Sequence, residues 1–277
     1  MDDLRLGVYD MKIAVLTDIH LYRKTDRVRC ALAAAEGADV LLITGDLADR
    51  AQREQYELLS ACIREQLGDI HVCCVSGNHD NPARDDTNFR EFEREINGQK
   101  LYDAEQSGAF YCRLNDLADI IGLNPVYHQK QFSFSEKGRQ LAFAEEKLDQ
   151  SDTVWHILMC HPPLIAHNPQ RTMDMSPYIA KEQDARLQRI VDSSRNVMVL
   201  SGHTHAAPQV EYDQGQNNIY INCGSICPTE TGDKDSPLQQ GNITMLEIGE
   251  KSVQVCISGI HTGKEFFSRV FPLSGAE

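Results

Sequence analysis

The tetrapeptide Gly77-Asn78-His79-Asp80 follows directly on the apolar run Val72-Cys73-Cys74-Val75 and the single residue Ser76. A short apolar run of this kind is typical of a buried strand, and such strands normally end in turn residues that carry no chemistry. Here the run leads to a glycine and then to an amide, an imidazole and a carboxylate in succession. We interpret the tetrapeptide as the floor of a metal site and ask which other parts of the chain bring ligands to it.

Four other apolar runs end in polar clusters in the same way, and helix-like patterns at residues 26–36 and 51–67 separate the first three runs. Alternating apolar strands and amphipathic helices indicate a parallel sheet that is covered on both faces. Because the carboxyl ends of such strands meet at one edge, we expect the clusters to lie close together. The five clusters are Asp18-x-His20, Asp46, Asn78-His79, His161 and His203-x-His205.

Beyond residue 206 the hydrophobic period changes to two, which predicts an antiparallel meander. We expect this meander to form much of a second sheet stacked on the first. In the middle of the chain, strands are expected near 110–114 and 119–123, helices near 87–97, 138–148 and 177–191, and a loop at 124–135. A second loop is expected at 226–242, within the C-terminal region. Since no repeat or linker divides the chain, residues 11–277 are predicted to form a single domain after an N-terminal tail at 1–10.

The chain of 277 residues carries 41 acidic and 27 basic side chains, a net charge of −14. Such a surface repels nucleic-acid phosphates and anionic membranes, so binding to either through charge is not expected. The nine cysteines are odd in number and several lie in apolar runs, which favours free thiols and a reducing, cytoplasmic compartment. The sequence also lacks an apolar stretch of membrane-spanning length and a signal-peptide core.

The clusters supply two carboxylates, one amide oxygen and four imidazoles. In an extended chain, positions i and i+2 point the same way, so Asp18 with His20, and His203 with His205, each offer two ligands to one spot. Seven donors exceed the four that one zinc ion needs, and they suit two ions that share a bridging carboxylate. Nitrogen and oxygen without thiolate suit Zn, Fe, Mn or Co, and two such cations leave a positive pocket for a phosphate.

The blocks D-x-H, G-D, G-N-H-D, H and G-H-x-H occur in this order between Asp18 and His205, and they resemble the calcineurin-like metallophosphoesterase family. Residues 45–49 together with 77–80 look most like its class III cyclic-nucleotide phosphodiesterase branch. The resemblance implies an α/β fold, a four-layer α/β/β/α sandwich with two mixed β-sheets flanked by helices. It also implies two divalent or trivalent transition-metal ions, Mn, Fe or Zn.

The resemblance further implies a role for each block. Two groups of side chains hold one ion each, one carboxylate bridges the two ions, and His79 faces the substrate and assists the leaving group without binding metal. The first ion would be bound by Asp18, His20 and His205 and the second by Asn78, His161 and His203, with Asp46 as the bridge. Asp80 either orients His79 or caps its turn, and both interpretations stay open.

The expected function is therefore a dinuclear-metal-dependent phosphoesterase that hydrolyses phosphodiester bonds, with cyclic nucleotides as one substrate class, by attack of a hydroxide that bridges the ions. Its partner would be a small phosphorylated substrate. Two alternatives stay open: a phosphomonoesterase or nucleotide pyrophosphate hydrolase on the same centre, and a non-catalytic binding module of the same fold. The remaining histidines lack a partner pattern and are interpreted as surface or packing residues, namely His71, His128, His156, His167 and His261.

Overall fold

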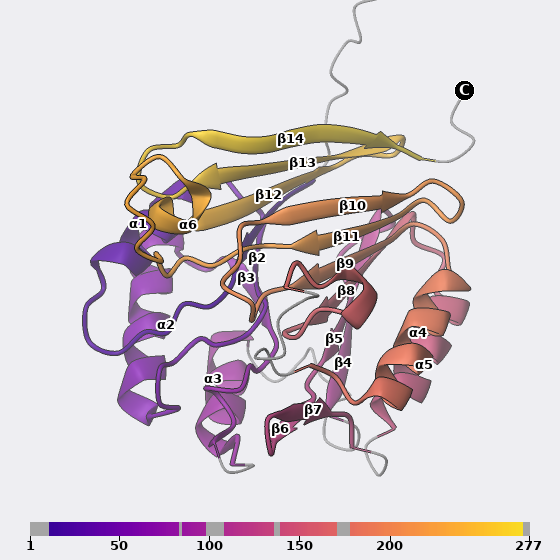
Figure 1. Ribbon diagram of the computed structural model, residues 1–277, viewed down its shortest axis with the longest axis horizontal. Helices are drawn as coiled ribbons and strands as arrows, with labels where there is room; N and C mark the ends of the chain where they lie inside the picture. The colour runs from indigo at the N-terminus through magenta and orange to yellow at the C-terminus, as the bar shows by residue number, and fades with distance from the viewer. Residues whose placement is uncertain (1–10, 83–84, 98–107, 136–138, 171–177, 274–277) are drawn as a thin grey trace, which may run out of the picture.

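The computed structural model describes residues 11–82, 85–135, 139–170 and 178–273, apart from 98–107. The N-terminal tail predicted at residues 1–10 lies outside the described residues. Within them, the chain forms two six-stranded sheets that face each other, with helices on the two outer sides (Figure 1). This is the four-layer α/β/β/α arrangement that the family resemblance implies, and both sheets are mixed.

The first sheet has the strand order β14-β13-β12-β1-β2-β3. Its three parallel strands come from the N-terminal repeat of strand and helix, and its three antiparallel strands come from the C-terminal end of the chain. The strands are β1 (Met11–Leu16), β2 (Val40–Ile43), β3 (His71–Cys74), β12 (Asn242–Ile248), β13 (Ser252–Gly259) and β14 (Glu265–Pro272).

The second sheet has the strand order β10-β11-β9-β8-β5-β4. Four central strands run parallel, and the two edge strands, β10 and β4, are antiparallel to their neighbours. The strands are β4 (Ala109–Arg113), β5 (Ala118–Leu123), β8 (Trp155–Cys160), β9 (Val197–Ser201), β10 (Gln209–Asp213) and β11 (Asn218–Asn222).

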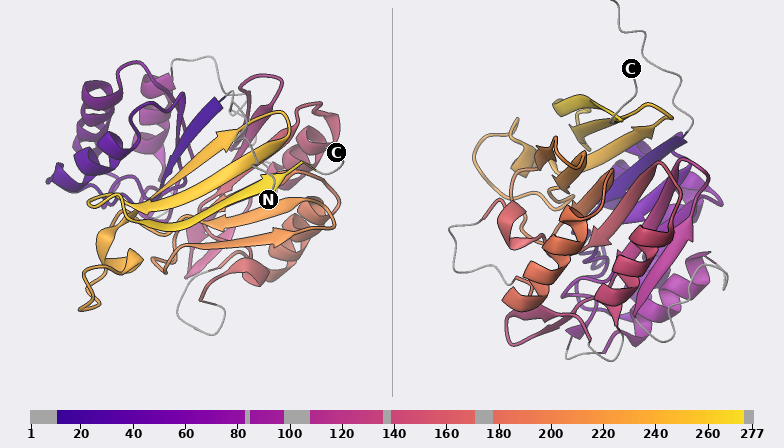
Figure 2. Two further views of the ribbon diagram at one scale, coloured as in Figure 1. Left: turned by 90° about the horizontal axis from the view of Figure 1, so that it is seen from above. Right: turned by 90° about the vertical axis from the view of Figure 1, so that its right-hand side faces the viewer.

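Two groups of helices cover the outer faces of the sandwich (Figure 2). The helices α1 (Asp26–Ala34), α2 (Arg53–Leu67) and α3 (Thr87–Asn97) pack on the first sheet, and α4 (Gln140–Gln150) and α5 (Lys181–Asp192) pack on the second. Smaller elements complete the chain: the hairpin β6 (Val126–His128) and β7 (Gln131–Ser133), the 3-10 turn η2 (Ile165–His167) and the short helix α6 (Pro237–Gln240). Among the described helices, none has both the length and the apolar character that a membrane span requires.

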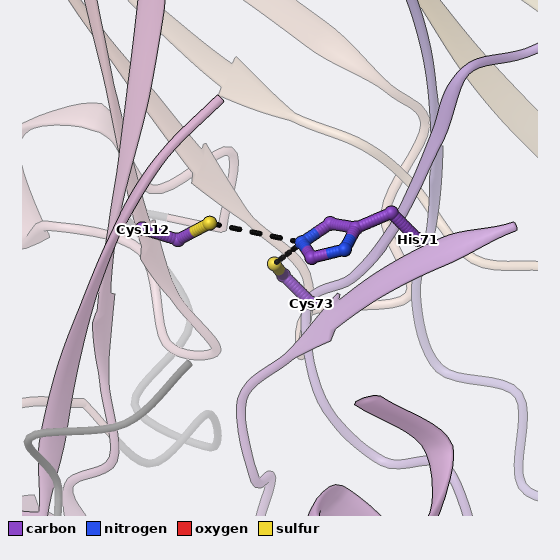
Figure 3. A group of neighbouring side chains, drawn as sticks. All are labelled: His71, Cys73 and Cys112. Atoms are coloured by element: carbon purple, nitrogen blue, oxygen red, sulfur yellow. Dashed lines mark hydrogen bonds between the residues drawn. The ribbon is translucent and has the colours of Figure 1, made fainter. Parts of the chain in front are cut away.

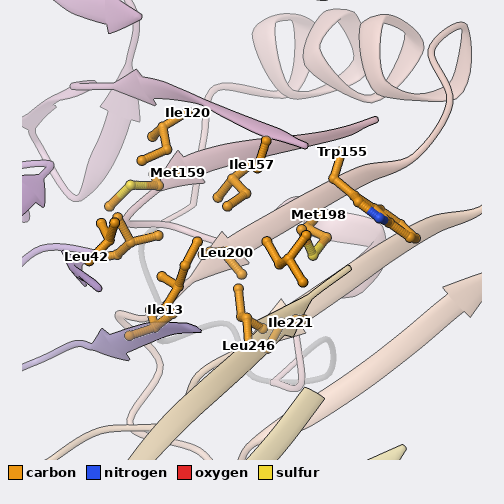
Figure 4. Close-up of a cluster of buried hydrophobic side chains, with 14 of the residues drawn as sticks. Ile13, Leu42, Ile120, Trp155, Ile157, Met159, Met198, Leu200, Ile221 and Leu246 are labelled. Carbon is orange, nitrogen blue, oxygen red and sulfur yellow. The ribbon is translucent and has the colours of Figure 1, made fainter. Parts of the chain in front are cut away.

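The core between the sheets explains why the strand sequences are continuously apolar (Figure 4). On β1, Ile13 and Val15 point into the layer between the sheets, whereas Ala14 and Leu16 point outward against the helices. Each strand that is buried on both faces therefore needs apolar residues at every position rather than at alternate ones.

Several expectations differ from the structure. The C-terminal meander β12–β14 extends the first sheet rather than building much of the second, because β12 pairs with β1. Only the hairpin β10–β11 joins the second sheet, and β11 lies parallel to β9. The loop expected at 124–135 contains the hairpin β6–β7, and α5 begins at Lys181 because Ile179 is held in a bridge with Phe132.

Candidate metal centre

Five strands from both sheets end at the same place, and each delivers polar side chains there. The first sheet contributes the residues that follow β1, β2 and β3, and the second sheet contributes those that follow β8 and β9. All seven side chains predicted to bind metal, and His79, come from these strand ends. The clusters were expected to meet at the edge of a single sheet. They meet instead where the parallel strands of two facing sheets end.

The first group of side chains consists of Asp18, His20 and His205, whose potential ligand atoms lie within 4.8 Å of one another. His20 Nε2 is 3.0 Å from His205 Nε2, and Asp18 Oδ1 is 3.2 Å from His205 Nε2 and 3.9 Å from His20 Nε2. Two imidazole nitrogens that face each other beside a buried carboxylate form a three-donor pocket of the kind that binds a cation.

The second group consists of Asp46, His161 and His203, again with potential ligand atoms within 4.8 Å of one another. The fully buried His161 places Nδ1 2.8 Å from the Thr44 carbonyl oxygen, which can only accept, so Nδ1 carries the hydrogen. Its Nε2 lone pair is then directed towards Asp46 Oδ2, 3.3 Å away. This is how a protein fixes the tautomer of a histidine that binds metal through Nε2.

Asp46 belongs to the second group and also lies close to the first. Its Oδ2 atom is 3.3 Å from His161 Nε2 and 3.6 Å from His20 Nε2, so one oxygen is close to a donor of each group. Its Oδ1 atom accepts the backbone N–H of His79 at 2.8 Å, which fixes the plane of the carboxylate. This is the position that a bridging ligand requires.

The donor set fits two divalent ions. Asn78 Oδ1 is buried without a hydrogen-bond partner among the described residues, which is costly unless another group, such as a cation, occupies the space in front of it. Asp18 and Asp46 are almost fully buried, and two carboxylates at this depth also require compensating positive charge. Oxygen and imidazole donors without thiolate are typical of Zn, Fe and Mn sites.

In the absence of a cation, protons supply part of this compensation. Burial opposes a charged imidazole at His161, but the Asp46 carboxylate outweighs burial and raises the pKa of His161 to about 9. Burial likewise opposes the charge of Asp46, yet His161 and His20 hold the pKa of Asp46 well below its usual range. A metal ion that binds between these groups would replace such protons.

The backbone at the site is held in an unusual conformation. Positive φ angles of 44° to 68° occur at five of the seven predicted ligands. A non-glycine residue in this region costs on the order of 1–3 kcal/mol, and such residues cluster at functional sites where the surrounding structure enforces them. The five residues are Asp18, His20, Asp46, His203 and His205.

The expectation from i and i+2 spacing holds for one of its two pairs. Asp18 and His20 reach one spot, whereas His203 joins the group of Asp46 and His205 joins that of Asp18, which is the division that the family resemblance implies. All four residues have a left-handed backbone rather than an extended one. The backbone N–H of His203 donates to Asp18 Oδ2 at 2.9 Å, which ties the two groups together.

Glycines stand where these loops approach closest. A Cβ atom on Gly77 would lie 2.1 Å from Asp46 Oδ1, and one on Gly202 would lie 1.9 Å from Thr17 Oγ1. Distances this short exclude any side chain, so the glycines allow the loops after different strands to pack against one another.

His79 and Asp80 differ in their surroundings. The His79 ring donates from Nδ1 to the Asp49 carbonyl oxygen at 2.8 Å, which leaves Nε2 available, and the ring stacks edge-on against His20 at a centroid distance of 4.5 Å. The buried Asp80 carboxylate instead accepts backbone N–H groups and the Tyr56 hydroxyl. Asp80 therefore organises the turn, and the Asp49 carbonyl orients His79.

Several residues that contact the site could not be identified from the sequence patterns. Phe132, fully buried on β7, packs edge-on against His203 at a centroid distance of 5.0 Å. Thr17 donates to Asp18 Oδ2 at 2.7 Å, and the Thr44 carbonyl fixes His161. Tyr56 lies on the apolar face of α2, where a buried hydroxyl needs a polar partner. Its hydrogen bond to Asp80 could therefore have been expected.

A sandwich of two mixed sheets, with carboxylates and imidazoles gathered at the strand ends, is the architecture of metal-dependent phosphoesterases. The model of the calcineurin-like phosphoesterase family matches residues 11–207, and the chain belongs to this family. It is accordingly a hydrolase of the metallophosphoesterase type.

Two curated relatives carry the name "Probable cyclic nucleotide phosphodiesterase". The protein from Synechococcus sp. is 26% identical over 219 residues, which cover 75% of this chain and 78% of the relative. The protein from Fibrobacter succinogenes is 22% identical over 183 residues, covering 66% of this chain and 63% of the relative.

Solved structures share the fold at low identity. A dimetal phosphatase from Danio rerio superposes with a TM-score of 0.67 at 11% identity, covering 96% of this chain and all of that one. A purple acid phosphatase from yellow lupin gives a TM-score of 0.62 at 13% identity and covers 94% of this chain and 53% of that one. These likenesses establish the two-sheet fold.

Proposed function

We propose that the chain is a phosphodiesterase that hydrolyses small phosphodiesters, cyclic nucleotides among them, at a centre of two metal ions. The observation that carries the proposal is the position of Asp46 Oδ2, 3.3 Å from His161 Nε2 and 3.6 Å from His20 Nε2, between two groups of three donors. The names of the two curated relatives support the diester substrate class.

Each ligand role is part of this proposal. One ion would be held by Asp18, His20 and His205, the other by Asn78, His161 and His203, with Asp46 shared. Mn, Fe and Zn all fit these donors. When bound, the two cations supply Lewis-acid polarisation of the phosphate ester and lower the pKa of a water molecule.

The chain's own residues do the remaining work. The Asp49 carbonyl holds the Nδ1–H of His79, so in the imidazolium form the second proton, on Nε2, is directed away from the backbone. From there it would protonate the leaving oxygen of the ester, a role that typically contributes about 10²–10⁴-fold in rate. Phe132 closes one side of the centre behind His161 and His203 and keeps water from that side.

The substrate is proposed to be small, because the net charge of −14 opposes binding of nucleic acid or an anionic membrane outside the centre. A cytoplasmic location belongs to the same proposal and is supported by nine cysteines that are all free thiols.

A substrate panel tests the function. The full chain, loaded in turn with Mn, Fe or Zn, is given bis-p-nitrophenyl phosphate, p-nitrophenyl phosphate and 3′,5′-cyclic nucleotides at equal concentrations. The proposal predicts a higher kcat/KM for the diesters than for the monoester with at least one metal. A preference for the monoester would assign a phosphomonoesterase, and no turnover with any metal would favour a binding module.

A further inference from the structure

A further group of metal-ligating side chains lies outside the metal centre, with His71 and Cys73 on β3 and Cys112 on β4 (Figure 3). His71 Nε2 lies 3.5 Å from Cys73 Sγ and 3.7 Å from Cys112 Sγ, and the three ligand atoms are within 4.8 Å of one another. Cys73 and Cys112 are buried, whereas His71 is half-buried at the rim.

The group joins the two sheets at one edge of the sandwich. β3 is an edge strand of the first sheet and β4 an edge strand of the second, and Cys73 and Cys112 project from them into the core between the sheets. His71 and Cys73 are two positions apart on β3 and so point to the same face. Cys74, the next residue, points to the opposite face, among the helices.

The two nitrogen–sulfur distances match tetrahedral coordination. Zn–S and Zn–N bonds of about 2.3 and 2.0–2.1 Å at a tetrahedral angle place sulfur and nitrogen about 3.5–3.6 Å apart. The two measured distances, 3.5 and 3.7 Å, lie at this value. Nε2 offers either one hydrogen or one lone pair, so it makes a full hydrogen bond with only one of the two sulfurs at a time.

Thiolate is the form in which cysteine binds metal, so an ion that binds between the three ligand atoms would displace the thiol protons.

We propose that His71, Cys73 and Cys112 bind a thiophilic metal ion, Zn²⁺ or Cu⁺, that links the edges of the two sheets. Two thiolates with one imidazole select such ions, in contrast to the thiolate-free donors of the phosphoesterase centre. Three ligands complete a trigonal Cu⁺ site, while Zn²⁺ takes water as a fourth ligand. The site is independent of the proposed phosphodiesterase activity.

Cobalt substitution tests the proposal. Reduced full-length protein is titrated with Co²⁺, and thiolate-to-cobalt charge-transfer absorption is recorded in the near ultraviolet. The phosphoesterase centre has no thiolate and gives no such band. We expect one equivalent of the signal in the wild type, its loss in Cys73→Ala and Cys112→Ala, and its retention in the matched control Cys74→Ala, a buried cysteine of the same strand that faces away.

The variant His71→Gln covers the case in which a core substitution prevents folding, because it leaves both thiols in place at a half-buried position. It should raise the Co²⁺ concentration for half-saturation by about tenfold or more. Zn²⁺ and Cu⁺ are then added separately, and loss of the cobalt band shows that the added ion binds to the same ligands.

Three results would overturn the proposal. One is a wild type without a charge-transfer band, and another is a band that persists in both Cys73→Ala and Cys112→Ala. The third is a Cys73–Cys112 disulfide, found by mass spectrometry in protein purified without reductant, together with no metal uptake after reduction, which would assign a redox pair instead.

Discussion

Replacing Asp80 by alanine should destabilise the protein strongly, because this buried carboxylate joins the two loops that carry Asp46 and Asn78. It accepts the backbone N–H of Gly77 at 2.9 Å and the Tyr56 hydroxyl at 2.8 Å. It also accepts two backbone N–H groups of the loop after β2, each at 3.1 Å. In Asp80→Ala, three backbone donors and one hydroxyl remain buried without an acceptor.

The size of the effect follows from these four bonds. A hydrogen bond to a charged group contributes about 1.5–3 kcal/mol, but the four share one acceptor and do not add. Burial, reinforced by the charge of Asp46, raises the pKa of Asp80 and offsets part of the gain. We therefore expect a loss of about 3–5 kcal/mol in the free energy of unfolding, the range found when one partner of a buried charged network is removed.

Urea denaturation of the protein with a chelator present measures this loss without a contribution from bound metal. Tyr56→Phe removes one of the four bonds and should cost about 1.5 kcal/mol. The control Asp39→Ala removes an exposed aspartate that accepts a single backbone N–H, and it should cost less than about 1 kcal/mol. An unfolding free energy of Asp80→Ala within about 1 kcal/mol of the wild type would refute the proposed role.

Three further predictions concern the centre itself. His79→Ala should keep both metal ions but lower kcat by about 10²–10⁴-fold, and full activity would contradict its role as proton donor. Asp46→Ala should lose bound metal as well as activity, as measured by emission spectroscopy, so an unchanged metal content would argue against bridging. Because the pKa of His161 in the metal-free site is raised to about 9 from 6.5, metal must displace a proton below that pH. Metal affinity should therefore rise by up to about tenfold per pH unit between pH 6.5 and about 9, and calorimetry in buffers of different ionisation enthalpy should detect the released proton.

The raised pKa of His161 also affects the stability of the metal-free protein. A histidine whose folded-state pKa is raised stabilises the fold at low pH, and this stabilisation is lost as the pH rises through the folded-state pKa. Without metal, stability should accordingly fall between pH 6.5 and about 9, whereas bound metal should remove this dependence.

The position of the candidate site could be predicted from sequence because strand direction and apolar periodicity constrain it. Continuous apolar runs before Asp18, Asp46 and Asn78 indicate parallel strands buried on both faces, and the carboxyl ends of such strands converge. Glycines directly before Asp46 and Asn78 likewise mark places where loops must approach closely. At Gly77, for example, an added Cβ atom would lie only 2.1 Å from Asp46 Oδ1.

The pairing of strands and the partners of single side chains could not be predicted in the same way. An alternating pattern fits either sheet, so nothing in residues 242–272 indicates that β12 pairs with β1 rather than with the second sheet. The division of His203 and His205 between two groups does not follow from their i and i+2 spacing, which predicts a single spot, and was indicated only by the family resemblance. The grouping of His71 with Cys112 likewise joins residues 41 positions apart, on strands of different sheets.

Anomalous diffraction from crystals of the metal-loaded protein tests the central claim most directly. Two peaks about 3.5–4 Å apart are expected, one beside Asp18 and His205 and the other beside His161, with Asp46 in contact with both. A single peak, or two peaks of which only one is in contact with Asp46, would contradict the dinuclear centre.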